Sequence, residues 1–377
     1  MKILVLIHEY PPIGGGGGRV AQDLCTGFAK NGHDVVVLTA DIDNLQSEQL
    51  EDFPVKRIWS ARKEAFRASF VAMLGYVVVG FWEAHKIVRN WQPDLIHVHF
   101  AVPAGPIAWL LAKIFKIPYV LTAHLGDVPD ASPEKTEQWF RWIFPFTPPI
   151  WKDAAEVVAV SEFTRQLALR HYPVDITVIP NGVDTQQFAP PEIVTNEMPR
   201  IIFAGRFVEQ KNPLTLITVL SGLIDLPWQC VMFGDGPLRT EVETAITKYK
   251  LNDRIVLRGW VDPAEVVQAF GRSEILFMPS KSEGLPVVGV QAMASGMAIV
   301  AGNVGGFQDI VMPGSNGYLY HPEDITSMQT GLRTYLEAPD ILLNARLNSL
   351  KLVKKFDLVT IVASYERIFH EVLTKRE

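Results

Sequence analysis

Short apolar runs alternate with longer amphipathic stretches along the whole chain, and this alternation limits the folds that the chain can adopt. In the first half the runs are rich in Val, Ile and Leu and too short for helices, which predicts buried strands at Ile3–Ile7, Val35–Thr39, Leu95–His99, Tyr119–Ala123 and Ala155–Val160. A helical pattern such as 20–30 lies between successive runs. Strand–helix alternation of this kind predicts an α/β fold with a doubly wound parallel sheet.

The second half repeats this architecture without repeating the sequence. It predicts strands at Arg200–Ala204, Gln229–Phe233, Ile255–Arg258, Ile275–Met278, Ala298–Ala301 and Tyr318–Leu319. A length of 377 residues suits two domains. We therefore expect domains at 1–187 and 200–356, a proline-containing linker at 188–199, and a last amphipathic helix at 357–377 that could pack back on the first domain. Two Rossmann-like domains facing each other would form a cleft at the carboxyl ends of their strands.

Composition excludes some classes of function and indicates a compartment. A net charge of −6 argues against a general nucleic-acid-binding protein. Cys25 and Cys230 stand in no metal or redox spacing, which favours two core side chains in a reducing, cytoplasmic environment. The first strand begins at residue 2 without a signal-peptide pattern, and the apolar run 68–82 is shorter than the roughly 20 residues needed to span a bilayer. That run predicts a buried or interfacial helix.

Five consecutive glycines, Gly14 to Gly18, follow the first predicted strand and precede a helix expected to start near Arg19. Glycines allow an anion to approach the backbone closely, and a helix N-terminus offers free N–H groups, so this loop suits a diphosphate. The spacing matches neither a Walker loop nor a clear dinucleotide fingerprint. A merely flexible loop remains the alternative interpretation.

Histidines end two of the predicted strands in the first half. His124 follows one strand and could donate a hydrogen bond to a substrate hydroxyl, although a structural role is the alternative. His97 and His99 end another strand with a spacing that could bind a metal. Because no third ligand or orienting carboxylate is near in the sequence, we expect no metal site there.

Charged residues follow the strands of the second half. Arg206 and Lys211 come after its first strand, and two fixed cations could stabilise a departing diphosphate. A solvated surface pair is the alternative. Glu283 precedes a helix that begins near Pro286, where it could accept bonds from sugar hydroxyls, and Gln291 lies two turns along that helix. The diglycine Gly305-Gly306 predicts a second loop of close approach.

Together these motifs resemble glycosyltransferase family 4, whose members have the two-domain GT-B fold, and the resemblance covers nearly the whole chain. The motifs that carry it are Gly15-Gly16, His124, Ser161-Glu162, Pro180-Asn181-Gly182-Val183-Asp184, Gly205-Arg206 with Lys211, and Gly234-Asp235-Gly236-Pro237. The resemblance implies that 1–187 binds the acceptor and 200–356 binds the nucleotide sugar. It also implies transfer from a UDP-, GDP- or ADP-linked sugar to a carbohydrate or lipid-linked acceptor in glycan, glycolipid or envelope polysaccharide synthesis.

The resemblance also assigns roles to residues. It gives catalytic roles to His124, Arg206, Lys211 and Glu283, with both cations on the diphosphate and Glu283 on the transferred sugar. Donor contacts fall on Gly15, Gly16, Gly205, Gly234, Trp260, Gly284, Leu285, Val287, Val288 and Gln291, and no cofactor or metal is expected. The sequence departs from the family signature at Gln291, where the family has a second glutamate that binds the ribose. A glutamine accepts one bond and donates another, so ribose binding would be weaker or differently selective.

The sequence also leads to expectations about the reaction mechanism and about where in the cell the protein lies. The resemblance implies a retaining reaction. Because the sequence shows no pair of carboxylates of the kind that a double displacement needs, we expect same-face attack by the acceptor, with the two cations replacing a metal. A non-catalytic donor-binding relative, and an epimerase or hydrolase on the same fold, are the alternatives. Lys56, Arg57, Arg62, Lys63 and Arg67 precede the apolar run, and aromatic residues crowd 139–146. Segments 56–82 and 139–146 could therefore rest on the inner face of a membrane, or the run could be an ordinary buried helix.

Overall fold

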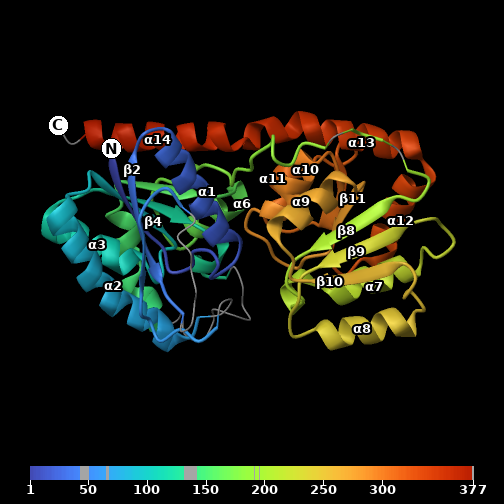
Figure 1. The fold of residues 1–377 in the computed structure, drawn as a ribbon, viewed down its shortest axis with the longest axis horizontal. Helices are drawn as coiled ribbons and strands as arrows, with labels where there is room; N and C mark the ends of the chain where they lie inside the picture. The colour runs from blue at the N-terminus through green and yellow to red at the C-terminus, as the bar shows by residue number, and fades with distance from the viewer. Residues whose placement is uncertain (43–50, 65–67, 131–141, 191, 195, 376–377) are drawn as a thin grey trace. The chain divides into compact units, whose positions relative to one another are not determined.

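The chain forms two compact units in a computed structural model that describes residues 1–42, 51–64, 68–130, 142–190, 192–194 and 196–375 (Figure 1). The first unit comprises Met1–Gly182 and Leu358–Glu377, and the second comprises Val183–Asp357. Both are α/β units with a parallel sheet, as the alternation of apolar runs predicts.

The sheet of the first unit has seven parallel strands in the order β3-β2-β1-β4-β5-β6-β7. Their bounds are β1 Lys2–Leu6, β2 Asp34–Ala40, β3 Val55–Ile58, β4 Leu95–His99, β5 Tyr119–Ala123, β6 Glu156–Ala159 and β7 Thr177–Val178. The chain runs outward from β1 in one direction and then returns to β4 on its other side. The order therefore reverses between β1 and β4, where open α/β sheets bind their ligands.

Helices cover both faces of this sheet. They are α1 Gly16–Lys30, α2 Phe70–Trp91, α3 Gly105–Phe115, α5 Pro148–Lys152, α6 Glu162–Leu169 and α14 Leu358–Thr374, with 3₁₀ turns η1 Leu125–Asp127 and η2 Phe144–Phe146. The C-terminal helix α14 packs against α1 in the first unit (Figure 1). Phe28 and Phe369 bring their rings within 5.3 Å, and Gly27 leaves room for Val362. Buried Val, Leu and aromatic side chains thus tie residues some 340 positions apart into one core.

The sheet of the second unit has six parallel strands in the order β10-β9-β8-β11-β12-β13. Their bounds are β8 Arg200–Ala204, β9 Gln229–Phe233, β10 Ile255–Gly259, β11 Ile275–Met278, β12 Ala298–Gly302 and β13 Gly317–Tyr320. The helices are α7 Pro213–Ser221, α8 Arg239–Lys248, α9 Pro263–Gly271, α10 Val287–Ala294, α11 Phe307–Ile310, α12 Ile325–Glu337 and α13 Pro339–Leu352, with η3 Glu209–Lys211 and η4 Val353–Phe356. Here the order reverses between β8 and β11.

The strands that sequence periodicity predicts are all present, with end shifts of one residue or none. Periodicity missed β3 and β7, because β3 is four residues long with Lys56 and Arg57 at its centre and β7 has only two residues. The segment 188–199, expected as a linker, lies within the second unit. Phe188 is buried there, and its carbonyl oxygen accepts a hydrogen bond of 3.0 Å from Ser295 Oγ.

Helix α2 has two different faces. Every fourth residue from Ala72 is buried on the protein, namely Ala72, Tyr76, Gly80, Ala84 and Val88. Every fourth residue from Phe70 is exposed, and the first four of these side chains, Phe70, Leu74, Val78 and Trp82, are apolar and 51% to 61% exposed. By length and composition alone α2 could cross a membrane, although 28% of its apolar window is buried in the unit. The packed face anchors α2 to the sheet, where Tyr76 Oη donates to Leu38 O at 3.0 Å.

Candidate functional site

In the second unit, a partly buried ion pair lies where the strand order reverses. Lys211 follows β8 and Glu283 follows β11, and these strands are neighbours in the sheet. Lys211 Nζ donates to Glu283 Oε1 at 2.6 Å, and the two side chains are 19% and 6% exposed. The structure therefore brings together two residues that are 72 positions apart and that the sequence assigned to the same ligand.

Backbone contacts fix the loops that carry this pair. Gln210 Nε2 donates to Ser282 O at 2.9 Å, and the N–H of Lys281 donates to Gln210 O at 2.8 Å. Gly205 lies beside the lysine stem, since a Cβ there would stand 3.5 Å from Lys211 Cδ. The pair is thus held by backbone as well as by charge. Sequence reasoning missed Gln210, because nothing in its local pattern marks a long-range contact.

The glycines after β9 and β12 have structural partners. Gly234, expected to contact the donor, has φ +122°, and a Cβ on it would lie 2.0 Å from Gly205 O. Gly305 has φ +52°, and its Cβ would lie 1.6 Å from Glu283 O. The N–H of Gly306 donates to Gly284 O at 2.6 Å. The diglycine after β12 thus supports the backbone that positions Glu283, and its approach to a ligand stays a prediction.

The remaining expected donor residues surround the same strand ends. Gly284 and buried Leu285 lead into α10, and Val287 and Val288 form its first turn, whose N–H groups have no acceptor within the helix. Gln291 is half-buried in the middle of α10. Arg206 is half-buried one residue after Gly205, and Trp260, directly after β10, is 55% exposed. Apart from Gln291, these residues lie in the segments that directly follow the strands of the second sheet.

In the first unit, the glycine loop follows β1, next to the reversal of the strand order. Helix α1 begins at Gly16 and Gly15 is its N-cap, so the helix starts three residues earlier than expected at Arg19. Gly14 and Gly18 pack against Glu9, and Gly17 packs against Phe100. Gly15 and Gly16 are the exposed members of the five, and a Cβ on Gly15 would meet nothing within 4 Å. These two glycines therefore present exposed backbone at a helix N-terminus.

His124 lies in the loop after β5 and is almost fully buried. Its ring stacks on Phe100 with centroids 4.4 Å apart, and its Nε2 lies 3.2 Å from His99 Nδ1. Burial lowers the pKa of His124 to about 4. A Cβ on Gly17 would stand 3.6 Å from His124 Nδ1, so this nitrogen faces the glycine loop. Phe100, which orients the ring, was missed because a lone aromatic after a strand carries no distinct signal.

The pair His97 and His99 makes hydrogen bonds within the protein. His97 Nε2 lies 2.8 Å from Thr122 Oγ1, and Thr122 in turn donates to Tyr365 Oη on α14 at 3.3 Å. Burial lowers the pKa of His97 to about 3 and holds that of His99 well below its ordinary value. Within the described part of the chain, no group of three or more His, Cys, Asp or Glu residues could hold a metal ion.

Only part of the basic cluster expected at 56–67 is exposed on the surface of the first unit. Arg62 is buried, donating to His8 O at 3.2 Å and to Glu9 Oε1 at 3.3 Å, and the half-buried Arg57 donates to Tyr10 O and Pro11 O. These guanidinium groups tie β3 and the segment after it to the loop after β1 instead of facing solvent. Arg67 and 139–141 lie outside the described residues.

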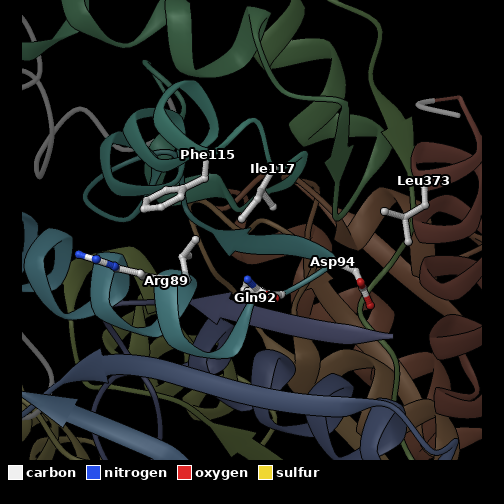
Figure 2. A pocket seen from close by; sticks show the side chains of 8 residues that line it. Arg89, Gln92, Asp94, Phe115, Ile117 and Leu373 are labelled. Carbon is white, nitrogen blue, oxygen red and sulfur yellow. The ribbon is translucent and has the colours of Figure 1, made fainter.

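A pocket of about 750 Å³ lies elsewhere in the first unit (Figure 2). Its lining comes from the C-terminal end of α2, the approaches to β4 and β5, and Leu373 of α14, with Arg89 and Asp94 as its charged residues. It opens at the amino ends of the strands. It is therefore separate from the glycine loop and His124, which follow the carboxyl ends.

Comparison with known proteins identifies the family. A model described as Glycosyltransferase Family 4 matches residues 14–187, and one described as Glycosyl transferases group 1 matches residues 185–350. The chain belongs to glycosyltransferase family 4. It is 25% identical to an uncharacterised glycosyltransferase of Methanocaldococcus jannaschii over 99% of each chain. It is 24% identical to glycogen synthase of Mycobacterium tuberculosis over 98% of this chain and 94% of that one.

Solved structures agree with the GT-B fold of this family 4 glycosyltransferase. Sucrose-phosphate synthase from Thermosynechococcus elongatus superposes with a TM-score of 0.85 at 21% identity, over 99% of each chain. HepE of Anabaena, solved in complex with UDP-glucose, superposes with a TM-score of 0.77 at 19% identity, over 100% of each chain. At these identities the superpositions show the fold and leave the substrates to be argued from the residues.

Proposed function

We propose that this glycosyltransferase retains anomeric configuration, requires no metal, and transfers a sugar from a nucleoside diphosphate sugar to a hydroxyl of a carbohydrate or lipid-linked acceptor. The observation that carries the proposal is the contact between Lys211 Nζ and Glu283 Oε1 at the reversal of the second sheet. A cation and a carboxylate at one point match the two parts of such a donor, because the diphosphate needs positive charge and the sugar hydroxyls need acceptors.

Each catalytic residue then has one task. Lys211 and Arg206 hold the diphosphate and stabilise the charge that develops on it as it leaves. Glu283 accepts hydrogen bonds from hydroxyls of the transferred sugar. Gly15 and Gly16 offer backbone N–H groups, and His124 donates a hydrogen bond to the reacting sugar. The complex of HepE with UDP-glucose supports a donor of this class.

The chemical step follows from these tasks. The acceptor oxygen bonds to the anomeric carbon on the face from which the diphosphate departs, and the bond from that carbon to the diphosphate oxygen breaks. The hydroxyl proton passes to the departing diphosphate oxygen, so charge and atoms balance without a protein base. The buried Glu283 is paired with the half-buried Lys211, which favours a hydroxyl-binding role over that of a nucleophile.

A thermal-shift series tests the donor assignment. UDP, GDP and ADP and their glucose conjugates are added in the presence of EDTA, and one base series is expected to raise Tm by several degrees, because a ligand bound only by the native state stabilises it. The shift should vanish in Lys211→Ala. Product analysis by proton NMR should then show the anomeric configuration of the donor.

Other outcomes favour the alternatives. No shift with any nucleotide would favour a relative that has lost donor binding through Gln291. Donor consumption without an acceptor would favour a hydrolase or an epimerase. Loss of transfer on adding EDTA would overturn metal independence.

We also propose that the first unit rests on the cytoplasmic face of a membrane through α2. The row of exposed apolar side chains, Phe70, Leu74, Val78 and Trp82, supports this surface. Gly75 approaches Ser60 closely, which places the 62% exposed Trp59 beside α2. Trp142 and Phe146 are also strongly exposed. The proposed contact with the membrane therefore depends more on apolar side chains than on the basic cluster, because Arg57 and Arg62 face inward.

A further inference from the structure

Two sets of hydrogen-bonded side chains, joined by a ring contact between His97 and His99, lie between α14 and the glycine loop of the first unit. His97 and His99 project from β4 with ring centroids 4.3 Å apart, and Thr122 projects from the neighbouring β5. Thr122 bonds Tyr365 of α14 on one side, and His99 bonds His124 on the other. All of these side chains are buried, so water cannot satisfy their polar atoms.

Burial keeps the three imidazoles neutral at neutral pH, so each ring carries one N–H. The position of that N–H follows from which nitrogen has a partner. His99 Nε2 is buried without a hydrogen-bond partner among the described residues, whereas His99 Nδ1 lies 3.2 Å from His124 Nε2. An unpaired buried N–H is rarer and more costly than a bare nitrogen, so His99 carries its proton on Nδ1.

The proton of His97 can be placed from the partners of its two ring nitrogens. His97 Nδ1 is buried and unpaired within the described part of the chain, so the proton of that ring lies on Nε2, which donates to Thr122 Oγ1. The Thr122 hydroxyl is then free to donate to Tyr365 Oη, as its geometry requires. No N–H of His97 or His99 is left without an acceptor in this arrangement.

We propose that His99 is a positioning residue that donates from Nδ1–H to His124 Nε2 and so holds His124 as its Nδ1–H tautomer. Since Nδ1 of His124 faces the glycine loop, the ring presents a donor there and accepts nothing. This inference rests on the proposed role of His124. It adds the residue that decides which nitrogen of the His124 ring is a donor and which is an acceptor. The ligand group at this nitrogen must then be a hydrogen-bond acceptor, such as a sugar or phosphate oxygen.

The decisive measurement is the tautomer of His124 in the free full-length protein. Long-range proton–nitrogen NMR of ¹⁵N-histidine-labelled protein at pH 7 distinguishes the two tautomers, and single substitutions assign the rings. We expect protonated Nδ1 on His124 and His99 and protonated Nε2 on His97. A His124 ring protonated at Nε2 would overturn the proposal.

Two variants of equal size separate positioning from packing. His99→Asn places an N–H group near the site of Nδ1 and is expected to keep the tautomer of His124, whereas His99→Asp offers acceptors alone and should move the His124 proton to Nε2. The same His124 tautomer in both variants would contradict the proposal. If the Asp variant does not fold, the wild-type spectrum still decides. Because the spectrum needs no donor, an inactive protein with Nδ1–H on His124 would refute only the proposed function.

Discussion

Lys211 Nζ and Glu283 Oε1 lie 2.6 Å apart, joining the ends of the two strands at which the second sheet reverses its order. Neither side chain has more than a fifth of its surface exposed. Gly305 and Gly306 support the backbone beneath Glu283, and Gln210 ties the two loops together. The pair is thus pre-positioned in the free protein, which is what electrostatic catalysis requires.

Removing the lysine should abolish most of the activity. Lys211→Ala is expected to lower kcat for glycosyl transfer by about 100-fold or more, because charge on the departing diphosphate loses a fixed cation. Steady-state kinetics measure this effect. Lys281→Ala is the matched control, since that lysine pairs with exposed Glu209 at 3.1 Å in the neighbouring loop. Equal kcat losses in the two variants would contradict the assignment.

The family glutamate at position 291 should improve donor binding. Gln291→Glu replaces an amide by a carboxylate that accepts bonds from both ribose hydroxyls, and hydrogen bonds to charged groups are stronger by about 1 kcal/mol. We expect the Kd for the preferred nucleotide to fall about five- to tenfold, as measured by titration calorimetry. An unchanged Kd would show that residue 291 does not contact the nucleotide, and a weaker Kd would show that the site prefers the amide to a carboxylate.

Adding a methyl group at Gly305 should destabilise the second unit. The Cβ of Gly305→Ala would lie 1.6 Å from Glu283 O at φ +52°, so the loop must shift as well as adopt a strained backbone. We expect a loss of well over about 1 kcal/mol of unfolding free energy and reduced donor binding.

Gly314→Ala is the control that separates two costs at Gly305, the strain of a positive φ and the steric clash with Glu283 O. Gly314 has φ +76°, but its Cβ would meet nothing within 4 Å. This control should lose only about 1 kcal/mol in urea unfolding. Similar losses in both variants would mean that the contact between Gly305 and Glu283 is unimportant.

The free energy of unfolding should decrease as the pH is lowered, because His97 and His124 are buried as neutral rings. Burial lowers the pKa of His124 to about 4 and that of His97 to about 3, against about 6.5 in an unfolded chain. Above pH 6.5 the two neutral rings make their full contribution to the free energy of unfolding. Below that pH the unfolded state gains protons that the native state does not bind, which favours unfolding by up to about 1.4 kcal/mol per pH unit for each ring until the native pKa is reached.

Urea unfolding at pH 7, 6 and 5 measures this slope. His97→Gln keeps an N–H near the position that bonds Thr122 and removes one titrating ring. It should therefore lower the slope by about 1.4 kcal/mol per pH unit. An identical slope in this variant would exclude His97 as a source of acid sensitivity.

Binding of the first unit to lipid should depend on the exposed row of α2. The double variant Val78→Ser, Trp82→Ser is expected to weaken sedimentation with phosphatidylglycerol vesicles by about tenfold or more, because both side chains lose apolar area that the bilayer would cover. Val359→Ser on α14 is the control, since Val359 is 76% exposed on another helix of the same unit. Equal binding by all three proteins would refute the membrane surface.

Local pattern predicted most of the fold and the candidate residues. The continuous apolar strands from β1 to β13 were found within a residue of their ends, because a strand buried on both faces must be apolar throughout. The short strands β3 and β7 were missed, since their few residues carry no such pattern. Lys211, Glu283 and His124 were nominated because they lie in loops that follow buried strands and match motifs of the family, and their roles stay predictions.

Short-range apolar patterning and motifs of adjacent residues were enough to predict the family and the two α/β units. They also nominated the residues to which we assign the chemistry, and those roles stay predictions. The tertiary structure decided which glycines face solvent and which make room for backbone, that Arg62 pairs with Glu9 inside the first unit, and that His99 contacts His124. The two side-chain contacts join residues 53 and 25 positions apart, and the roles of the glycines depend on the space left around a backbone atom. Such contacts are set by the packing of whole strands and helices, which no local pattern records.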